Sequence, residues 1–155
     1  GLGPKLLVEK EAISAVETPL VVPLYTWRQA AGLANGSPEV PLDDHRPHLA
    51  SPVDHSECAY ALEVRGASMS NSPGPISFSE KDALFVERYL EPENGSFVIA
   101  RIDNEEEATF RQLMIEGASK YLHALNPAWP SRIIDFKSHS IEIVGVVIAR
   151  STRFS

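Results

Sequence analysis

The chain has 155 residues, 43% of them hydrophobic, and a formal net charge of −7, which suits one domain with a real apolar core. This acidic balance argues against direct nucleic-acid binding, because nucleic-acid binders normally carry a basic patch. The single cysteine, Cys58, excludes an internal disulfide and fits a reducing compartment. The apolar run 144–149 is too short to span a bilayer, and the N-terminus lacks the pattern of a secretion signal. We therefore expect a soluble cytoplasmic protein that has no membrane segment and, since it begins without Met, is compatible with a fragment of a longer one.

The first third of the chain does not show a regular pattern. Residues 5–16 are compatible with a short helix, and we take residues 1–20 as the remnant of a linker. Residues 18–56 are rich in Pro, Asp, His and Gly, which favours a long extended segment with many turns. Loops of this length are usually functional or disordered. Because the composition changes near residue 59, we expect residues 21–58 to form an arm and loop apart from the rest.

Residues 59–155 predict short strands separated by turns. Residues 60–65 alternate in polarity with a period of two, as in a half-buried strand. Asn94-Gly95 is a strong hairpin signal and predicts that strand 82–90 pairs with strand 96–102. Further turns are expected at 103–104 and 116–117, and further strands at 108–115, 119–126 and 139–150. Strands at this spacing without a convincing helix predict a mostly β fold, a small barrel or coiled sheet.

Ser68 is the first candidate for chemistry. It follows strand 60–65 and Gly66, where a turn can present a side chain and aim N–H groups at a developing oxyanion. Taken alone, the tripeptide more often means a plain turn serine. No histidine lies on an obvious partner strand, and His123 better suits a surface position. The other known arrangement pairs the serine with a buried, neutral lysine that acts as the base.

The remaining candidates carry less weight. The spacing H-x2-H-x6-H-x2-C over residues 45–58 matches no common zinc pattern, and its prolines favour a rigid loop, so we assign no metal site and no cofactor. The acidic run 103–107 is interpreted as a solvated hairpin tip. Cys58 is interpreted as structural, and Trp27 and Trp129 as packing anchors. The residues considered for the metal site are His45, His48, His55 and Cys58, with Asp43 and Asp44 close by.

Several stretches, in order and at fitting spacings, resemble one known family over residues 21–148. The sequence is similar to the C-terminal domain of the LexA and phage-repressor family of self-cleaving proteins (peptidase family S24), and within it to phage-type and pyocin-type repressors. VPLYTWRQAAG resembles the cleavage segment, LEVRGASM the nucleophile turn, and FSEKDALFVE a strand entry in which Lys81 stands where glycine is usual. EATFRQL resembles the strand of the general-base lysine, and KYLHALNPAWP and IVGVVIA resemble the closing segments.

The resemblance implies the site residues and the fold. Ser68 would be the nucleophile, in a turn with Gly66 and Met69 that supplies the oxyanion donors, and Ala31-Gly32 would be the scissile pair. The fold would be a small coiled β-sheet or barrel of the LexA–signal-peptidase type with an extended N-terminal cleavage arm. Ala31-Gly32 would enter a narrow pocket as an extended strand, and residues 21–27 would pair with the sheet edge. The alternative is a linker that happens to contain small residues.

Arg111 is the departure from the family pattern, because it occupies the position of the general-base lysine. Arginine stays protonated in proteins and cannot take a proton from Ser68. Neighbouring strand residues point to the opposite face, and neither Lys81 nor Lys120 is in the matching register. An exposed strand arginine is the plain alternative, although its parity with Leu113 leans towards a half-buried face. We therefore expect self-cleavage to be absent or very slow, whether the arginine is natural or engineered.

The resemblance also implies the biology. The chain would be the dimerising, regulatory domain of a phage-type transcriptional repressor, whose N-terminal helix-turn-helix domain is absent from this sequence and would alone contact operator DNA. It would form a homodimer or higher oligomer, and a RecA filament or an antirepressor protein would induce it. Two alternatives stay open: an active S24 autopeptidase with an unforeseen base, and an SOS polymerase accessory protein of the UmuD type.

Overall fold

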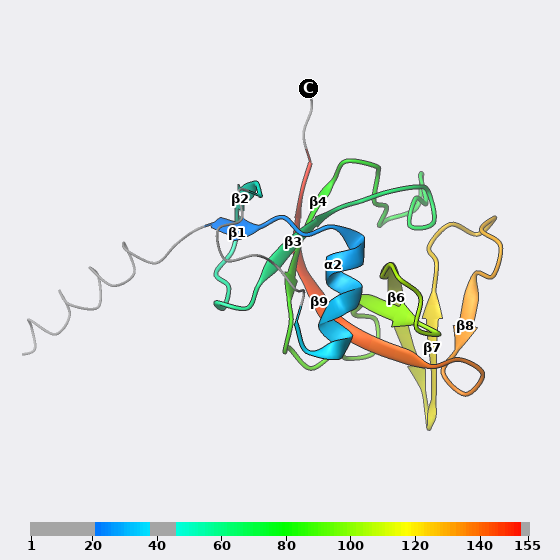
Figure 1. Ribbon diagram of the computed structural model, residues 1–155. Coiled ribbons are helices and arrows are strands. Elements are labelled where there is room, and N and C mark those ends of the chain that lie inside the picture. Colours follow the sequence, from blue (N-terminus) through cyan, green and yellow to red (C-terminus); the bar gives the residue numbers. More distant parts are fainter. Residues whose placement is uncertain (1–20, 38–45, 153–155) are drawn as a thin grey trace, which may run out of the picture.

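The architecture is a coiled antiparallel sheet with one short helix packed against it (Figure 1). The computed structural model describes residues 21–37 and 46–152. Seven strands form the main sheet in the order β3-β4-β9-β5-β6-β7-β8. Their bounds are β3 Tyr60–Glu63, β4 Ala83–Glu87, β5 Phe97–Ile102, β6 Thr109–Glu116, β7 Ser119–His123, β8 Ile133–Asp135 and β9 Ile141–Ser151. The prediction of a mostly β fold with a small coiled sheet is confirmed.

Two of the three predicted hairpins are present. β5 pairs with β6 across a turn in which Asp103 and Asn104 both have positive φ, and β6 pairs with β7 across Gly117. The third prediction is wrong: β4 and β5 are not neighbours, although Gly95 does adopt a positive φ. The long strand β9 lies between them and pairs with both. A local turn signal cannot reveal that β9, which begins only at Ile141, will lie between the two strands.

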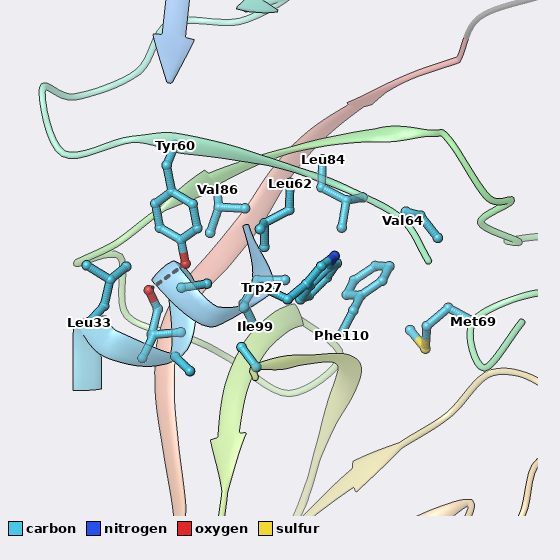
Figure 2. Close-up of a cluster of buried hydrophobic side chains, with 14 of the residues drawn as sticks. Trp27, Leu33, Tyr60, Leu62, Val64, Met69, Leu84, Val86, Ile99 and Phe110 are labelled. Carbon is cyan, nitrogen blue, oxygen red and sulfur yellow. Dashed lines mark hydrogen bonds between the residues drawn. The ribbon is translucent and has the colours of Figure 1, made fainter. Parts of the chain in front are cut away.

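Both faces of the sheet are covered by apolar side chains. Along β5, Ile99 belongs to one buried cluster, whereas its neighbours Val98 and Ala100 belong to another. Since successive strand residues point to opposite faces, the two clusters lie on opposite sides of the sheet. Figure 2 shows the first cluster, in which Trp27 lies beside Phe110.

Gly145 allows a close approach within this first cluster. A side chain there would meet Val86 Cγ1 at 2.3 Å and the hydroxyl of Tyr60 at 2.8 Å. Tyr60 is fully buried and its hydroxyl donates to the carbonyl of Val144 at 2.9 Å, drawn as a dashed line in Figure 2. Burial raises the pKa of this phenol well above its usual range, so it stays a neutral donor.

The helix α2 (Trp27–Gly32) is fixed by local sequence and by burial. Thr26 caps it: its hydroxyl accepts from the Gln29 N–H at 3.0 Å, and the Gln29 side chain accepts from the Thr26 N–H at 2.9 Å. This reciprocal capping box satisfies two N–H groups that the helix cannot satisfy itself. A 3-10 turn, η1 (Leu33–Asn35), continues the helix, and Arg88 donates to the carbonyls of Leu33 and of Gly36, which caps the turn.

A small second sheet precedes the helix. β1 (Val21–Pro23) pairs with β2 (His48–Ala50), and Leu24 bridges Ala61 in β3. The predicted pairing of residues 21–27 with the sheet edge is thus present at Leu24 and at Tyr25, whose N–H donates to the Ala61 carbonyl at 2.8 Å. The helix expected over residues 5–16 lies outside the described residues. Within the described ranges, no helix is both long and apolar enough to cross a lipid bilayer.

Candidate functional site

Ser68 lies in a tightly held turn after β3. Gly66 adopts φ 75°, a conformation that suits glycine and reverses the chain after the strand. Asn126 holds the turn from the segment after β7: its N–H donates to the Ser68 carbonyl at 2.9 Å and its side-chain amide to the Ala67 carbonyl at 3.0 Å. Ser68 is only 9% exposed. A serine in a free surface turn would not be held or buried in this way.

Arg111 reaches Ser68 from β6. Its Nη1 donates to Ser68 Oγ at 2.9 Å and to the carbonyl of Phe110 at 2.7 Å. Arg111 is 9% exposed, which excludes the alternative of an exposed strand arginine. It is more deeply buried than the half-buried face that its parity with Leu113 indicated. The structure therefore brings together the two residues that the sequence paired across 43 positions.

The direction of this hydrogen bond follows from its donor. A guanidinium has five N–H groups and no acceptor, so Ser68 Oγ must accept. The hydroxyl proton of Ser68 is consequently directed away from Arg111. A neutral lysine would do the reverse and accept the serine proton. The pair as it stands polarises Ser68 Oγ but offers nothing in Arg111 that can remove its proton.

Arg111 is a buried cation with little compensation. Among the described residues, no carboxylate forms an ion pair with it, and its Nε is buried without a hydrogen-bond partner. Burial lowers the pKa of the Arg111 guanidinium, and the charge of Glu105 partly opposes that shift. Because arginine starts from a pKa above 12, it remains protonated at neutral pH.

A small cavity opens beside Ser68. It has a volume of about 80 Å³ and is lined by Trp27, Val64, Arg65, Ser68, Met69, Ala108, Thr109 and Phe110. Trp27 is the residue of helix α2 that lines the cavity. Two hydrogen bonds hold it there: its indole N–H donates to the Glu63 carbonyl at 3.0 Å, and its carbonyl accepts from the Ala108 N–H at 3.0 Å. Trp27 was interpreted from the sequence as a packing anchor; at 7% exposed it is one, and it also borders the site.

Two backbone N–H groups in the Ser68 turn have no hydrogen-bond acceptor among the described residues. Among the hydrogen bonds of the described residues, neither the Ser68 nor the Met69 N–H donates to any acceptor. The Met69 carbonyl and sulfur are in contrast both engaged, with Phe78 and Leu125. Unpaired N–H groups beside a serine hydroxyl are what an oxyanion hole requires.

Ala31-Gly32 do not lie in this cavity. They belong to helix α2 and border a different hollow together with Arg101 and Asn104. The expectation of an extended strand at this pair is therefore wrong. The capping box starts a helix at Trp27, Arg28-Gln29-Ala30-Ala31 favours it, and Ala31 is only 3% exposed because it packs in the first cluster.

The acidic hairpin tip does more than face solvent. Glu106 forms an ion pair of 2.7 Å with Arg28 of helix α2, and Glu107 one of 3.0 Å with Arg65 at the cavity. The Arg65 partner holds the pKa of the Glu107 carboxyl below its usual range. Sequence analysis missed both pairs, because residues 28 and 65 meet the tip only through the fold.

Among the described residues, the loop residues considered as metal ligands do not form a cluster. Asp43, Asp44 and His45 lie outside the described residues. Within residues 21–37 and 46–152, no group of three or more His, Cys, Asp or Glu side chains lies close enough to hold a metal ion. His48 and His55 have ring nitrogens close to backbone carbonyls.

Comparison with known proteins places this geometry in context. The model of the family described as Peptidase S24-like matches residues 23–148. The chain is 37% identical over 129 residues to the HTH-type transcriptional regulator for conjugative element SXT of Vibrio cholerae, covering 81% of this chain and 57% of that protein. It is 38% identical over 96 residues to repressor protein C2 of Salmonella phage P22 (62% and 43% covered). It is 34% identical over 129 residues to prophage repressor CohE of Escherichia coli (83% and 54% covered). The chain thus spans about half the length of the curated relatives it matches.

Proposed function

The chain belongs to the peptidase S24-like family, and from this premise we propose that it is the C-terminal regulatory domain of a phage-type or conjugative-element-type transcriptional repressor whose self-cleavage is disabled. Its relatives are named as repressors and HTH-type regulators, and this chain matches roughly half of each. The DNA-binding role falls to a separate helix-turn-helix domain. This part of the protein carries the acidic β domain, for which no direct DNA contact is expected.

The hydrogen bond from Arg111 Nη1 to Ser68 Oγ, at 2.9 Å, carries the proposal. It supports Ser68 as the family's nucleophile and Arg111 as the residue at its general-base position. A nucleophilic serine needs a base within hydrogen-bond reach. Arg111 is within reach and is no base, so the proton-transfer step fails.

The state of helix α2 supports the same proposal from the other side. Cleavage between Ala31 and Gly32 requires the pair to enter the cavity at Ser68 in an extended form, with the carbonyl of Ala31 exposed to attack. In the structure the pair is helical, and Ala31 is buried in the first cluster. Cutting the chain would require helix α2 to unfold and leave the sheet.

The remaining parts of the proposal concern partners. The domain forms a homodimer or a higher oligomer, which lets two DNA-binding heads engage two operator half-sites with avidity. Induction comes from a RecA filament or from an antirepressor protein that binds this domain. The protein acts in the bacterial cytoplasm.

Self-cleavage at alkaline pH tests the proposal directly. High pH deprotonates a buried lysine, so the Arg111→Lys variant is expected to split between Ala31 and Gly32, whereas the unchanged chain stays intact. Mass spectrometry of the fragments identifies the bond. The double variant Ser68→Ala with Arg111→Lys is the matched control and should stay intact.

Each outcome has a defined meaning. If the unchanged chain splits at this bond, Arg111 is not at the base position and the proposed defect is absent. If Arg111→Lys also stays intact, Ser68 and position 111 do not form a latent dyad. Sedimentation of the unchanged chain tests the oligomer separately, because a monomer at tens of micromolar would contradict dimerisation by this domain.

A further inference from the structure

The Ser68–Arg111 pair has a polarity that suits binding an anion. Arg111 donates to Ser68 Oγ, so the hydroxyl proton of Ser68 is free to donate elsewhere. Ser68 lines the 80 Å³ cavity, whereas Arg111 is not among the lining residues. The positive charge of Arg111 therefore acts on the cavity through a hydroxyl that it polarises. A hydrogen bond in such a chain is strengthened by its neighbour.

Within the described ranges, Arg111 has no carboxylate as a direct partner, although the charge of Glu105 acts on it and Glu107 pairs with Arg65 at the same cavity. No ion pair among the described residues includes Arg111, whose side chain is buried. Of its nitrogens, Nη1 alone makes hydrogen bonds with the described residues, and Nε is buried without a partner. An uncompensated buried cation is costly, and an anion placed nearby would reduce that cost.

In the described part of the chain, two residues that line the cavity also have unpaired backbone donors. The N–H groups of Ser68 and Met69 have no acceptor among the described residues. Arg65 lines the cavity as well, although Glu107 already holds its guanidinium at 3.0 Å. The other walls are apolar: Trp27, Val64 and Phe110. The cavity thus offers donors at Ser68 and an apolar lining for a neighbouring side chain.

We propose that the cavity beside Ser68 is a carboxylate-binding site, in which the hydroxyl of Ser68 and the N–H groups of the Ser68 turn hold the C-terminal carboxylate of a peptide chain. The volume fits a planar group of three heavy atoms with a small side chain beside it, since each water-sized group needs roughly 10–15 Å³ of such space. A tetrahedral phosphate brings more charge close to the acidic tip at residues 105–107. The site does not depend on the repressor role, since it follows from the residues at the cavity.

Titration with small carboxylates tests the proposal on the unchanged chain. Amide resonances of Ser68 and Met69 are followed by two-dimensional NMR during addition of sodium acetate, with sodium chloride at equal ionic strength as the salt control. A second pair of titrations uses N-acetyl-alanyl-alanine with either a free C-terminal carboxylate or a C-terminal amide. The free acid is expected to shift both resonances saturably, and the amide and chloride are not.

Two variants connect that binding to the pair. Arg111→Gln removes the cation and is expected to weaken acetate binding roughly 10- to 100-fold, and Ser68→Ala is expected to weaken it by about tenfold. Lys137→Gln removes the same charge from an exposed turn and should leave the affinity unchanged. Because the acid–amide comparison needs no substitution, a variant that fails to fold does not remove the test.

The outcomes separate the two sources of a carboxylate. Tighter binding of the peptide acid than of acetate supports a chain terminus as the occupant, and equal binding supports the carboxylate chemistry but not the chain. Binding of the amide as strong as that of the acid overturns the proposal, as does acetate binding that Arg111→Gln leaves intact. Absence of any saturable shift with acetate and acid also overturns it.

Discussion

The turn that holds Ser68 and the helix that holds Ala31-Gly32 differ in whether the fold brings them to the proposed site. Ser68 and Arg111 meet at 2.9 Å, so the pair proposed as nucleophile and base position is assembled. Ala31-Gly32 lie in a capped helix, so the pair proposed for cleavage is folded away from Ser68. One region depends on strand register and the other on local helix signals. The comparison teaches that two residues of a proposed site can meet in space while the segment proposed as their substrate is folded elsewhere.

Trp27 links the two regions, and its removal should have the largest effect. It starts helix α2, borders the cavity and packs beside Phe110, as Figure 2 shows. Trp27→Ala should destabilise the protein by about 3–5 kcal/mol, because a buried aromatic side chain and its hydrogen bond are lost. Urea unfolding measures this change. Trp129→Ala, at a half-buried position, should cost less than half as much; equal costs would show that Trp27 does not join the regions.

Arg111 sharpens the comparison because it is buried without a carboxylate. Arg111→Met should leave stability unchanged or raise it by about 1 kcal/mol, since an uncompensated charge is replaced by an apolar side chain of similar length. Arg101 is the matched control: its side chain is 11% exposed and pairs with Glu142 at 2.7 Å. Arg101→Met should destabilise by about 1–2 kcal/mol, because Glu142 loses its partner. If both changes destabilise alike in urea unfolding, Arg111 is compensated.

The capping box should determine how firmly the cleavage segment is held. Thr26→Ala should cost about 1 kcal/mol, and most of it should appear as faster hydrogen exchange at Ala30 and Ala31. In an Arg111→Lys background the same change should speed self-cleavage several-fold, since helix α2 must open first. Thr26→Ser keeps the capping oxygen and is the control. Slower cleavage in the Thr26→Ala background would mean that the helix helps to place the scissile pair.

The ion pair between Arg28 and Glu106 should contribute least. Both side chains are mostly exposed, at 68% and 74%. Glu106→Gln should therefore cost about 0.2–0.5 kcal/mol at low salt and nothing measurable at high salt. The neighbouring Glu105, which forms no ion pair with the described residues, provides the control through Glu105→Gln. A salt-independent loss specific to Glu106→Gln would show that the tip holds helix α2 by packing.

The sequence predicted those parts of the molecule that depend on local pattern. Alternation located β3, and turn residues located the β5–β6 and β6–β7 hairpins. The pairing of Arg111 with Ser68 came from the family resemblance of EATFRQL, whereas strand parity indicated only a half-buried face. Partner choice between distant strands was not predictable, which is why β4 and β5 were paired wrongly. Helix α2 was missed although Thr26 and Gln29 carry its start signal, because resemblance to an extended cleavage segment outweighed six residues of helical pattern.

The position of β9 has a consequence for how the domain forms. Strands β3 and β4 lie on one side of β9 and β5 to β8 on the other, and the sheet order joins the two sets only through β9. Residues 141–151 must therefore leave the ribosome before the sets can share a ladder. Until then each set exposes an edge that β9 will later cover, and such edges invite pairing with other chains. Newly made chains are thus most exposed to aggregation just before synthesis of β9 ends.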